Sequence, residues 1–366
     1  MTGSDSWTIE RYSASGGEDL LGLTREVAGE SEAADPAYQY WQWEKSPAGP
    51  PVTVVAREAG TGRLVGLAAA LPMSVRISGT VYTAGLSFNP VVGADYQSRA
   101  LAADLLAEVC AQSEKDGISF TYGFPSQVAL PAFLGRGGFK DVGAVPFLVR
   151  PLRPESLAMK TTGSRVLGRT ASLARIVWRT PSISQQDQLP GLEIDEIDAF
   201  DEPFAIFWHR VQHRFPIMVV RDPAYLNWRF KGLATREYKV LEARSEGKIR
   251  AYIAMRVAAL GRLSAGLIVD LMVETSGEGR AAGRLLIDRA TAYFREQDLD
   301  LVAALALRHT DEFRLLRARG FWVSPRFLEP QSFRMVVRAH EEEASPSHLA
   351  YRLRNWYLTL GDYEAF

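Results

Sequence analysis

The sequence of 366 residues lacks the usual marks of a secreted, membrane-spanning or nucleic-acid-binding protein. Its only cysteine is Cys110, so no disulfide can form within the chain. No apolar run approaches the ~18 residues of a membrane-spanning helix, and the acidic first thirty residues contain no signal-peptide core. With Lys+Arg 42 and Asp+Glu 43, the formal net charge of −1 provides no field to attract nucleic acid. We therefore expect a cytoplasmic protein with no integral membrane segment and no nucleic-acid partner.

The composition is that of an ordinary globular protein, with 47% hydrophobic and 23% charged residues. The chain is longer than the roughly 250–300 residues at which one hydrophobic core stops growing, so two domains are expected. Cys110 falls on the apolar side of an amphipathic segment, which favours a core residue over a nucleophile.

An internal repeat supports the same division. The phrase Asp-Pro-Ala-Tyr that begins at Asp35 returns 187 residues later at Asp222, and in both places a tryptophan follows. Further landmarks recur in the same order, which predicts one fold built twice in tandem. These landmarks are Leu105-Leu106 with Leu285-Leu286, and Gly138-Phe139 with Gly320-Phe321.

The first half predicts the order β-α-α-β-β-β-α-β-α-β. The three strands at 52–58, 64–75 and 81–92 are separated by turn residues, which predicts an antiparallel meander. A strongly amphipathic helix follows at 100–115. The remaining expected elements are strands 7–12, 118–124 and 142–149, and helices 18–28, 36–43 and 129–136.

The second half repeats this order between residues 192 and 337. We expect an α+β (α/β) fold of two domains, each a mostly antiparallel mixed sheet flanked by helices. The expected divisions are 1–153, a linker at 154–190, 191–338, and a C-terminal tail helix within 339–366. In the linker, 170–179 mixes apolar residues with arginines, which fits a helix at the domain junction or one that meets a membrane surface.

The most specific short motif lies between the strand ending at Val92 and the amphipathic helix. Backbone N–H groups at a helix N-terminus have no internal partner, and small side chains such as Ala100 and Ala102 let an anion approach them. Gln97 and Ala102, followed by Leu105-Leu106, resemble the acyl-CoA-binding motif of the GNAT superfamily of N-acetyltransferases, although Ala100 stands where that family prefers glycine.

The resemblance implies an acyl-CoA such as acetyl-CoA as co-substrate, with no metal. The implied cofactor-binding residues are Val91, Val92, Gln97, Ser98, Arg99, Ala100, Leu101, Ala102 and Gln127.

The resemblance also implies catalytic roles. The N–H near Val92 would polarise the thioester carbonyl, but Leu134 stands where the family has its proton-donating tyrosine. Water, Tyr96 or Tyr122 is left as the proton donor, and Asp270 is a candidate base or a turn residue. Candidate acceptor contacts, which are otherwise plain strand or core residues, are Ser87, Asn89 and Trp228.

In the second half, Arg280 replaces a small residue of the motif, so we expect that copy to have lost the cofactor. The sequence predicts an N-acyltransferase acting on a primary amine of a small molecule, such as an amino sugar or a natural-product scaffold. Two alternatives are a catalytically inactive binding protein and an aminoacyl-tRNA-dependent transferase. The oligomeric state is not indicated.

Overall fold

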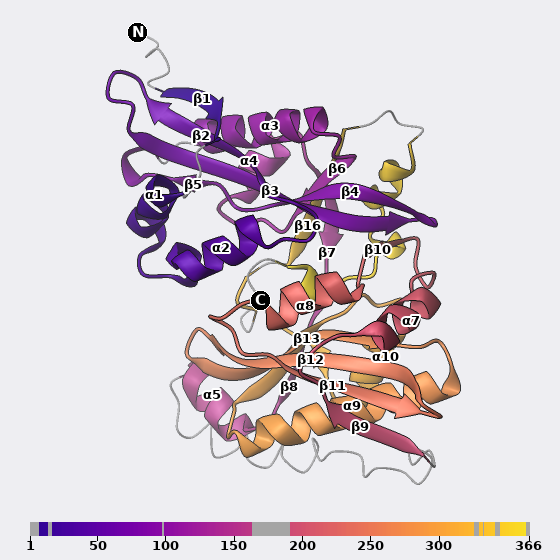
Figure 1. Cartoon of the computed structure of the whole chain (residues 1–366). Helices are drawn as coiled ribbons and strands as arrows, with labels where there is room; N and C mark the ends of the chain where they lie inside the picture. The colour runs from indigo at the N-terminus through magenta and orange to yellow at the C-terminus, as the bar shows by residue number, and fades with distance from the viewer. Residues whose placement is uncertain are drawn as a thin grey trace.

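The computed structural model describes residues 7–13, 17–96, 99–162, 191–325, 329–331, 333–340 and 345–363 (Figure 1). It contains two mostly antiparallel sheets, each flanked by helices, which confirms the expected α+β architecture. The helix expected at 170–179 lies outside the described residues, as do Gln97 and Ser98.

The first sheet has the strand order β1-β2-β3-β4-β6-β16-β7, and all its pairs are antiparallel except β4 with β6. The expected meander is confirmed as β2-β3-β4. The strands are β1 Trp7–Arg11, β2 Val52–Glu58, β3 Leu64–Ile77, β4 Thr80–Ser87, β6 Phe120–Gly123, β16 Arg334–Ala339 and β7 Lys140–Ala144, with β5 Val91–Val92 and β10 Ile217–Val219 also on β3.

The second sheet has the order β15-β8-β14-β13-β12-β11-β9, again with one parallel pair, β13 with β14. Each sheet therefore has its parallel pair between the fourth strand of its half and the next strand, as one fold built twice requires. The strands are β15 Trp322–Val323, β8 Phe147–Pro151, β14 Leu301–Leu305, β13 Leu263–Val273, β12 Lys248–Leu260, β11 Lys239–Ser245 and β9 Leu192–Glu196.

The two halves exchange their last strands. β8 belongs to the first half by sequence but pairs with β14 and β15 of the second sheet, while β16 of the second half pairs with β6 and β7 of the first. Figure 1 shows β16 in yellow among the purple strands. The division expected at residue 153 therefore does not coincide with the division between the sheets.

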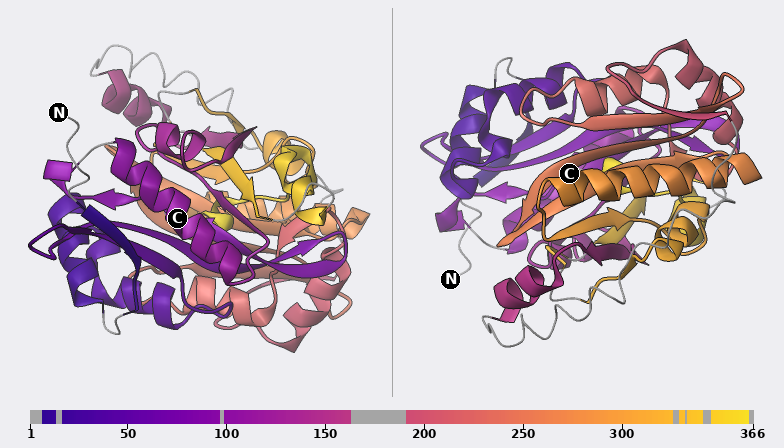
Figure 2. Two further views of the ribbon diagram at one scale, coloured as in Figure 1. Left: turned by 90° about the horizontal axis from the view of Figure 1, so that it is seen from above. Right: turned by 90° about the horizontal axis from the view of Figure 1, so that it is seen from below.

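The helices cover both faces of each sheet. Figure 2 shows the long helix α3 across the first sheet from above and the long helix α9 across the second from below. The opposite faces look toward each other, and the side chains between them form one hydrophobic core shared by both halves. The helices are α1 Glu18–Ala28, α2 Pro36–Glu44, α3 Arg99–Lys115, α4 Leu130–Leu134, α5 Pro154–Thr162, α7 Glu202–Val211, α8 Pro223–Lys231, α9 Gly277–Glu296 and α10 Asp311–Ala318.

The repeated phrase forms the contact between the halves. Asp35 and Asp222 cap α2 and α8, each accepting a backbone N–H, and proline follows at the first helical position. The indoles of Trp41 and Trp228 stack with centroids 4.5 Å apart, and each Nε1 donates to the other tryptophan's carbonyl oxygen. Such a stack contributes ~0.5–1.5 kcal/mol beyond the buried area. The halves are thus related by an approximate twofold axis at this point.

The expected tail helix is wrong, because the tail forms three short 3-10 turns joined by extended chain, namely η6 Pro346–Tyr351, η7 Leu353–Asn355 and η8 Leu360–Asp362. Consecutive side chains of the tail contact opposite halves of the molecule. Extended chain places neighbouring side chains on opposite sides, whereas a helix does not. Trp356 packs on Phe120 and Tyr122 of the first sheet, whereas the Tyr357 hydroxyl donates to the Leu271 carbonyl oxygen of the second. The tail therefore lies inside the core between the two sheets.

Candidate functional site

The first sheet opens where β4 and β6 stop pairing. Their parallel ladder runs from Ala84 opposite Phe120 to Ser87 opposite Gly123. A Cβ on Gly123 would lie 2.9 Å from the Ser87 carbonyl oxygen, so glycine permits this approach. Beyond it the chain returns to β3 as β5, and the ladder with β6 is not resumed.

At this opening the backbone of Val92 turns toward the unpaired side. The Gly93 N–H donates to the Val65 carbonyl oxygen at 2.9 Å, and Val92 lies opposite Gly66. Because bonded and non-bonded pairs alternate along an antiparallel ladder, the Val92 N–H points away from β3 and toward the opening. This is the direction that an amide needs to polarise a carbonyl bound there.

The loop after Val92 leads directly into α3. Gly93 is followed by a 3-10 turn over Ala94–Tyr96, and α3 begins at Arg99. Ala100 is exposed, Ala102 is half-buried and Leu101 is fully buried against the sheet. The first-turn N–H groups of α3 have no partner within the helix, and neither alanine places a bulky side chain beside them.

The structure brings Asn89 and Gln127 to the same edge. The Ser126 N–H donates to Asn89 Oδ1 at 3.1 Å, which joins the segment after β4 to the turn that carries the exposed Gln127. Ser87, in contrast, is only 4% exposed, and its hydroxyl bonds the neighbouring carbonyl oxygen. We infer that Ser87 shapes the strand end and does not contact an acceptor.

Neither candidate tyrosine is placed to protonate a thiolate. The hydroxyl of Tyr96 donates to Glu58, and this bond raises the pKa of Tyr96. Tyr122 is fully buried against Trp356 and Phe124, and burial raises its pKa well above the ordinary value, which makes it a weaker acid. We infer structural roles for both.

Asp270 is also a structural residue by its contacts. It is 1% exposed, accepts from Arg221 Nε at 3.0 Å, and accepts from the Tyr252 hydroxyl at 2.7 Å. Arg221 also donates to Asp362 of the tail at 2.7 Å. A carboxylate held in this way cannot reach a substrate amine, so the expected catalytic role of Asp270 is replaced by that of an anchor for the tail.

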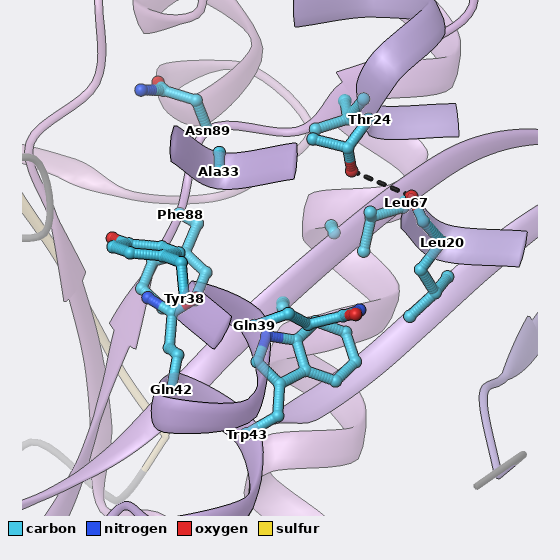
Figure 3. Close-up of a pocket in the computed structure, with 13 residues that line it drawn as sticks. Leu20, Thr24, Ala33, Tyr38, Gln39, Gln42, Trp43, Leu67, Phe88 and Asn89 are labelled. Carbon is cyan, nitrogen blue, oxygen red and sulfur yellow. Dashed lines mark hydrogen bonds between the residues drawn. The ribbon is translucent and has the colours of Figure 1, made fainter. Parts of the chain in front are cut away.

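A pocket lies beside the opening, on the face of the first sheet that α1 and α2 cover (Figure 3). Its volume is about 550 Å³, counting the open mouth. Its lining is aromatic, aliphatic and amide-bearing, without a charged side chain. It consists of Leu20, Thr24, Ala33, Tyr38, Gln39, Gln42, Trp43, Leu67, Ala68, Ala69, Phe88, Asn89 and Val91.

Two smaller pockets continue from it along β3 toward the second half. The nearer pocket is lined by Gln42, which also lines the first pocket. Met73, Tyr225 and Trp228 line both the nearer and the farther pocket. Trp228 therefore lies on a pocket wall at the junction of the halves.

In the second sheet the corresponding opening is filled. Val273 matches Val92, because the next N–H, that of Glu274, donates to the third-strand carbonyl of Arg250. The Val273 N–H, however, donates to the Glu312 carboxylate at 3.2 Å, and its carbonyl oxygen accepts from Arg214 at 2.6 Å. The backbone groups that point into the first opening are thus used by side chains in the second.

The start of α9 is closed in the same way. Ser276 Oγ accepts from the Gly279 N–H at 2.9 Å, and the Glu274 carboxylate is held by Arg210 and Arg250. An anion bound at this helix end would meet two carboxylates, Glu274 and Glu278. Sequence reasoning found the substitution at Arg280 but missed Glu312 and Arg214, because the local sequence carries no sign of their contacts with β13.

Among the described residues, no group of three or more His, Cys, Asp or Glu side chains is arranged to hold a metal ion. None of the described helices has the length and apolar character needed to cross a membrane.

Comparison with known proteins agrees with this geometry. Residues 8–141 match the family model of the acetyltransferase (GNAT) domain. No protein of curated function matches the chain significantly.

Several solved structures share the fold over nearly the whole chain. A probable N-acyltransferase from Enterococcus faecalis V583 is 12% identical with a TM-score of 0.61, over 92% of this chain and 72% of that one. N-myristoyltransferase from Saccharomyces cerevisiae with bound myristoyl-CoA is 15% identical with a TM-score of 0.62, over 94% and 85%. A GCN5-related N-acetyltransferase from Anabaena variabilis ATCC 29413 is 14% identical with a TM-score of 0.60, over 92% and 73%.

The likeness to these structures extends across both sheets, whereas the family model covers the part that contains the open β4–β6 end and the loop into α3. The fold, the motif and the family match therefore agree with the resemblance found in the sequence: residues 8–141 match the acetyltransferase (GNAT) domain, and nearly the whole chain shares its fold with solved N-acyltransferases.

Proposed function

We propose that the chain transfers an acyl group from an acyl-CoA, such as acetyl-CoA, bound in its first domain to the primary amine of a small molecule, such as an amino sugar or a natural-product scaffold. The observation that supports this most directly is the contrast between Val92 and Val273. The first amide points into an opening, whereas the second is bonded to Glu312. Only the first domain thus keeps a backbone donor for a carbonyl.

The proposed cofactor contacts are Val91, Val92 and residues 97–102, with Gln127 at the rim. Attack of the amine nitrogen on the thioester carbon forms the C–N bond, and the C–S bond breaks as the thiolate leaves. The Val92 N–H stabilises the negative charge that develops on the carbonyl oxygen. Water carries the proton from the ammonium and supplies the one that the thiolate takes, since Tyr96 and Asp270 are hydrogen-bonded to other residues and burial raises the pKa of Tyr122 well above its ordinary value.

The substitution Ala102→Glu tests the cofactor site. A carboxylate in the first turn of α3 would repel the diphosphate, so acetyl-CoA should no longer raise the Tm of the variant. The matched control is Ala111→Glu, a half-buried position on the same helix about 14 Å further along the axis. If the Ala102→Glu variant is stabilised as much as the control, the cofactor site lies elsewhere.

The inactive-protein alternative makes a different prediction. At 100 times its Kd, a ligand stabilises the folded state by about 2.7 kcal/mol. Wild-type protein whose Tm does not respond to millimolar acetyl-CoA would favour the inactive alternative. A tRNA-dependent transferase would instead be retained on RNA at low salt, with retention falling steeply as salt is added.

A further inference from the structure

Gln42 is a buried amide with no partner. The residue is 6% exposed, its amide makes no hydrogen bond within the described residues, and the amide atoms are open to the pocket, since they are not fully buried. It lines both the pocket beside the opening and the smaller pocket next to it. Figure 3 shows it rising from α2 near Tyr38 and Phe88. A buried polar group is nearly always hydrogen-bonded, so one that faces a pocket without a partner points to a ligand.

Matching positions in the two halves, related by the approximate twofold axis, indicate which chemical group such a ligand carries. Tyr38 and Gln42 on α2 correspond to Tyr225 and Arg229 on α8, since Trp41 matches Trp228. In the second half both side chains donate to one atom, the carbonyl oxygen of Gly361, at 3.2 Å from Tyr225 and 3.0 Å from Arg229.

The tail occupies the place that is a pocket in the first half. Gly361 packs against the Val269 carbonyl oxygen, which lies 3.5 Å from a Cβ built on that glycine. Val269 stands four residues before Val273, as Phe88 stands four residues before Val92. Phe88 lines the first-half pocket, so a molecule there would sit between Phe88 and Gln42 as Gly361 sits between Val269 and Arg229.

The lining determines the charge of the occupant. None of its thirteen side chains is charged, so a carboxylate or phosphate would be buried there without a counter-ion. The amide of Gln42 offers both a donor and an acceptor, which suits a hydroxyl or carbonyl group. Aromatic side chains, among them Tyr38 and Trp43, provide apolar surface for a carbon skeleton.

We propose that this pocket binds the acceptor and that Gln42 is its specificity-determining residue, reading an uncharged oxygen-bearing group of a hydroxylated amine. The proposal rests on the transferase function proposed above. It adds that the acceptor is recognised through a neutral oxygen, in the position that the Gly361 carbonyl oxygen holds in the second half.

The test replaces Gln42 by Met, which has a similar shape and helix propensity but no amide. Two effects of opposite direction are expected. The Tm of the free protein should rise, because a largely buried amide without a protein partner is replaced by an apolar side chain. The preference for glucosamine over cyclohexylamine, measured as the ratio of kcat/KM values with acetyl-CoA, should fall about tenfold or more.

Gln212→Met is the matched control, since its amide donates to the His209 carbonyl oxygen outside all these pockets. Its Tm should not rise and its preference should not change. A Gln42→Met variant with a lower Tm, or with an unchanged preference, overturns the proposal. So does a wild-type protein that binds acetyl-CoA but does not acylate glucosamine. Absence of acetyl-CoA binding in the wild type would contradict the proposed function itself.

Discussion

Leu130→Glu should block the opening beside Val92 with a carboxylate, as Glu312 blocks the corresponding opening beside Val273 in the second sheet. Aligning Gly138-Phe139 with Gly320-Phe321 places Leu130 at the position of Glu312. Leu130 begins α4 and packs in the same hydrophobic cluster as Val92. By this alignment we expect a carboxylate there to accept the Val92 N–H, as Glu312 accepts the Val273 N–H at 3.2 Å.

Two effects add in this variant. Loss of one donor to the developing oxyanion reduces kcat about 10²–10³-fold. The new charge also repels the cofactor diphosphate, by about 2.8 kcal/mol for unit charges ~6 Å apart at an effective dielectric constant of ~20. That energy corresponds to roughly a hundredfold weaker binding.

The assay pairs thermal stabilisation by acetyl-CoA with steady-state acyl transfer. Leu130→Gln is the control, because it has nearly the same size as glutamate without the charge. The control should keep most of the acetyl-CoA stabilisation, whereas the Glu variant should lose it. Equal stabilisation of the two variants would show that Val92 does not face the bound cofactor, and the comparison between the two openings would then fail.

Three further predictions concern stability. Glu312→Leu removes the nearest carboxylate from the buried Arg214 and leaves it with Asp311, 4.0 Å away, so urea unfolding should show a loss of about 3–5 kcal/mol, and a loss below 1 kcal/mol would contradict this reading. Arg221→Met leaves two buried carboxylates without their cation and should cost a similar amount, partly recovered at low pH because burial raises the pKa of Asp362 and favours its neutral form. Burial alone would raise the pKa of Asp300, but bonds from Lys160 and two serines lower it, so its stabilisation is present above pH ~4 and is lost as pH falls further. The stability difference between wild type and Asp300→Asn should therefore vanish in acid, and a constant difference down to pH 2 would refute the assignment.

The elements that could be predicted from the sequence are those with local causes. Asp35-Pro36 and Asp222-Pro223 mark the helix starts that the structure shows, because cap and first turn depend only on neighbouring residues. The two copies of the fold were also predictable, because each copy carries the same local phrase at the start of the same helix.

The features that could not be predicted depend on contacts distant in sequence. The strand at 147–151 has the same apolar pattern whichever sheet it joins, so its exchange leaves no mark in the residues themselves. Gln42 likewise reads as an ordinary helix residue. Its proposed role depends on the pocket that it lines and on the tail, which occupies the corresponding place in the second half.

Strand exchange also has a consequence for synthesis on the ribosome. β16 is an interior strand of the first sheet, between β6 and β7, yet it is translated after every strand of the second sheet. Until residues 334–339 leave the ribosome, β6 and β7 each present an unpaired edge. A truncated chain ending after the first half would keep those bare edges and should aggregate, so the first sheet cannot be completed before residues 334–339 have been made.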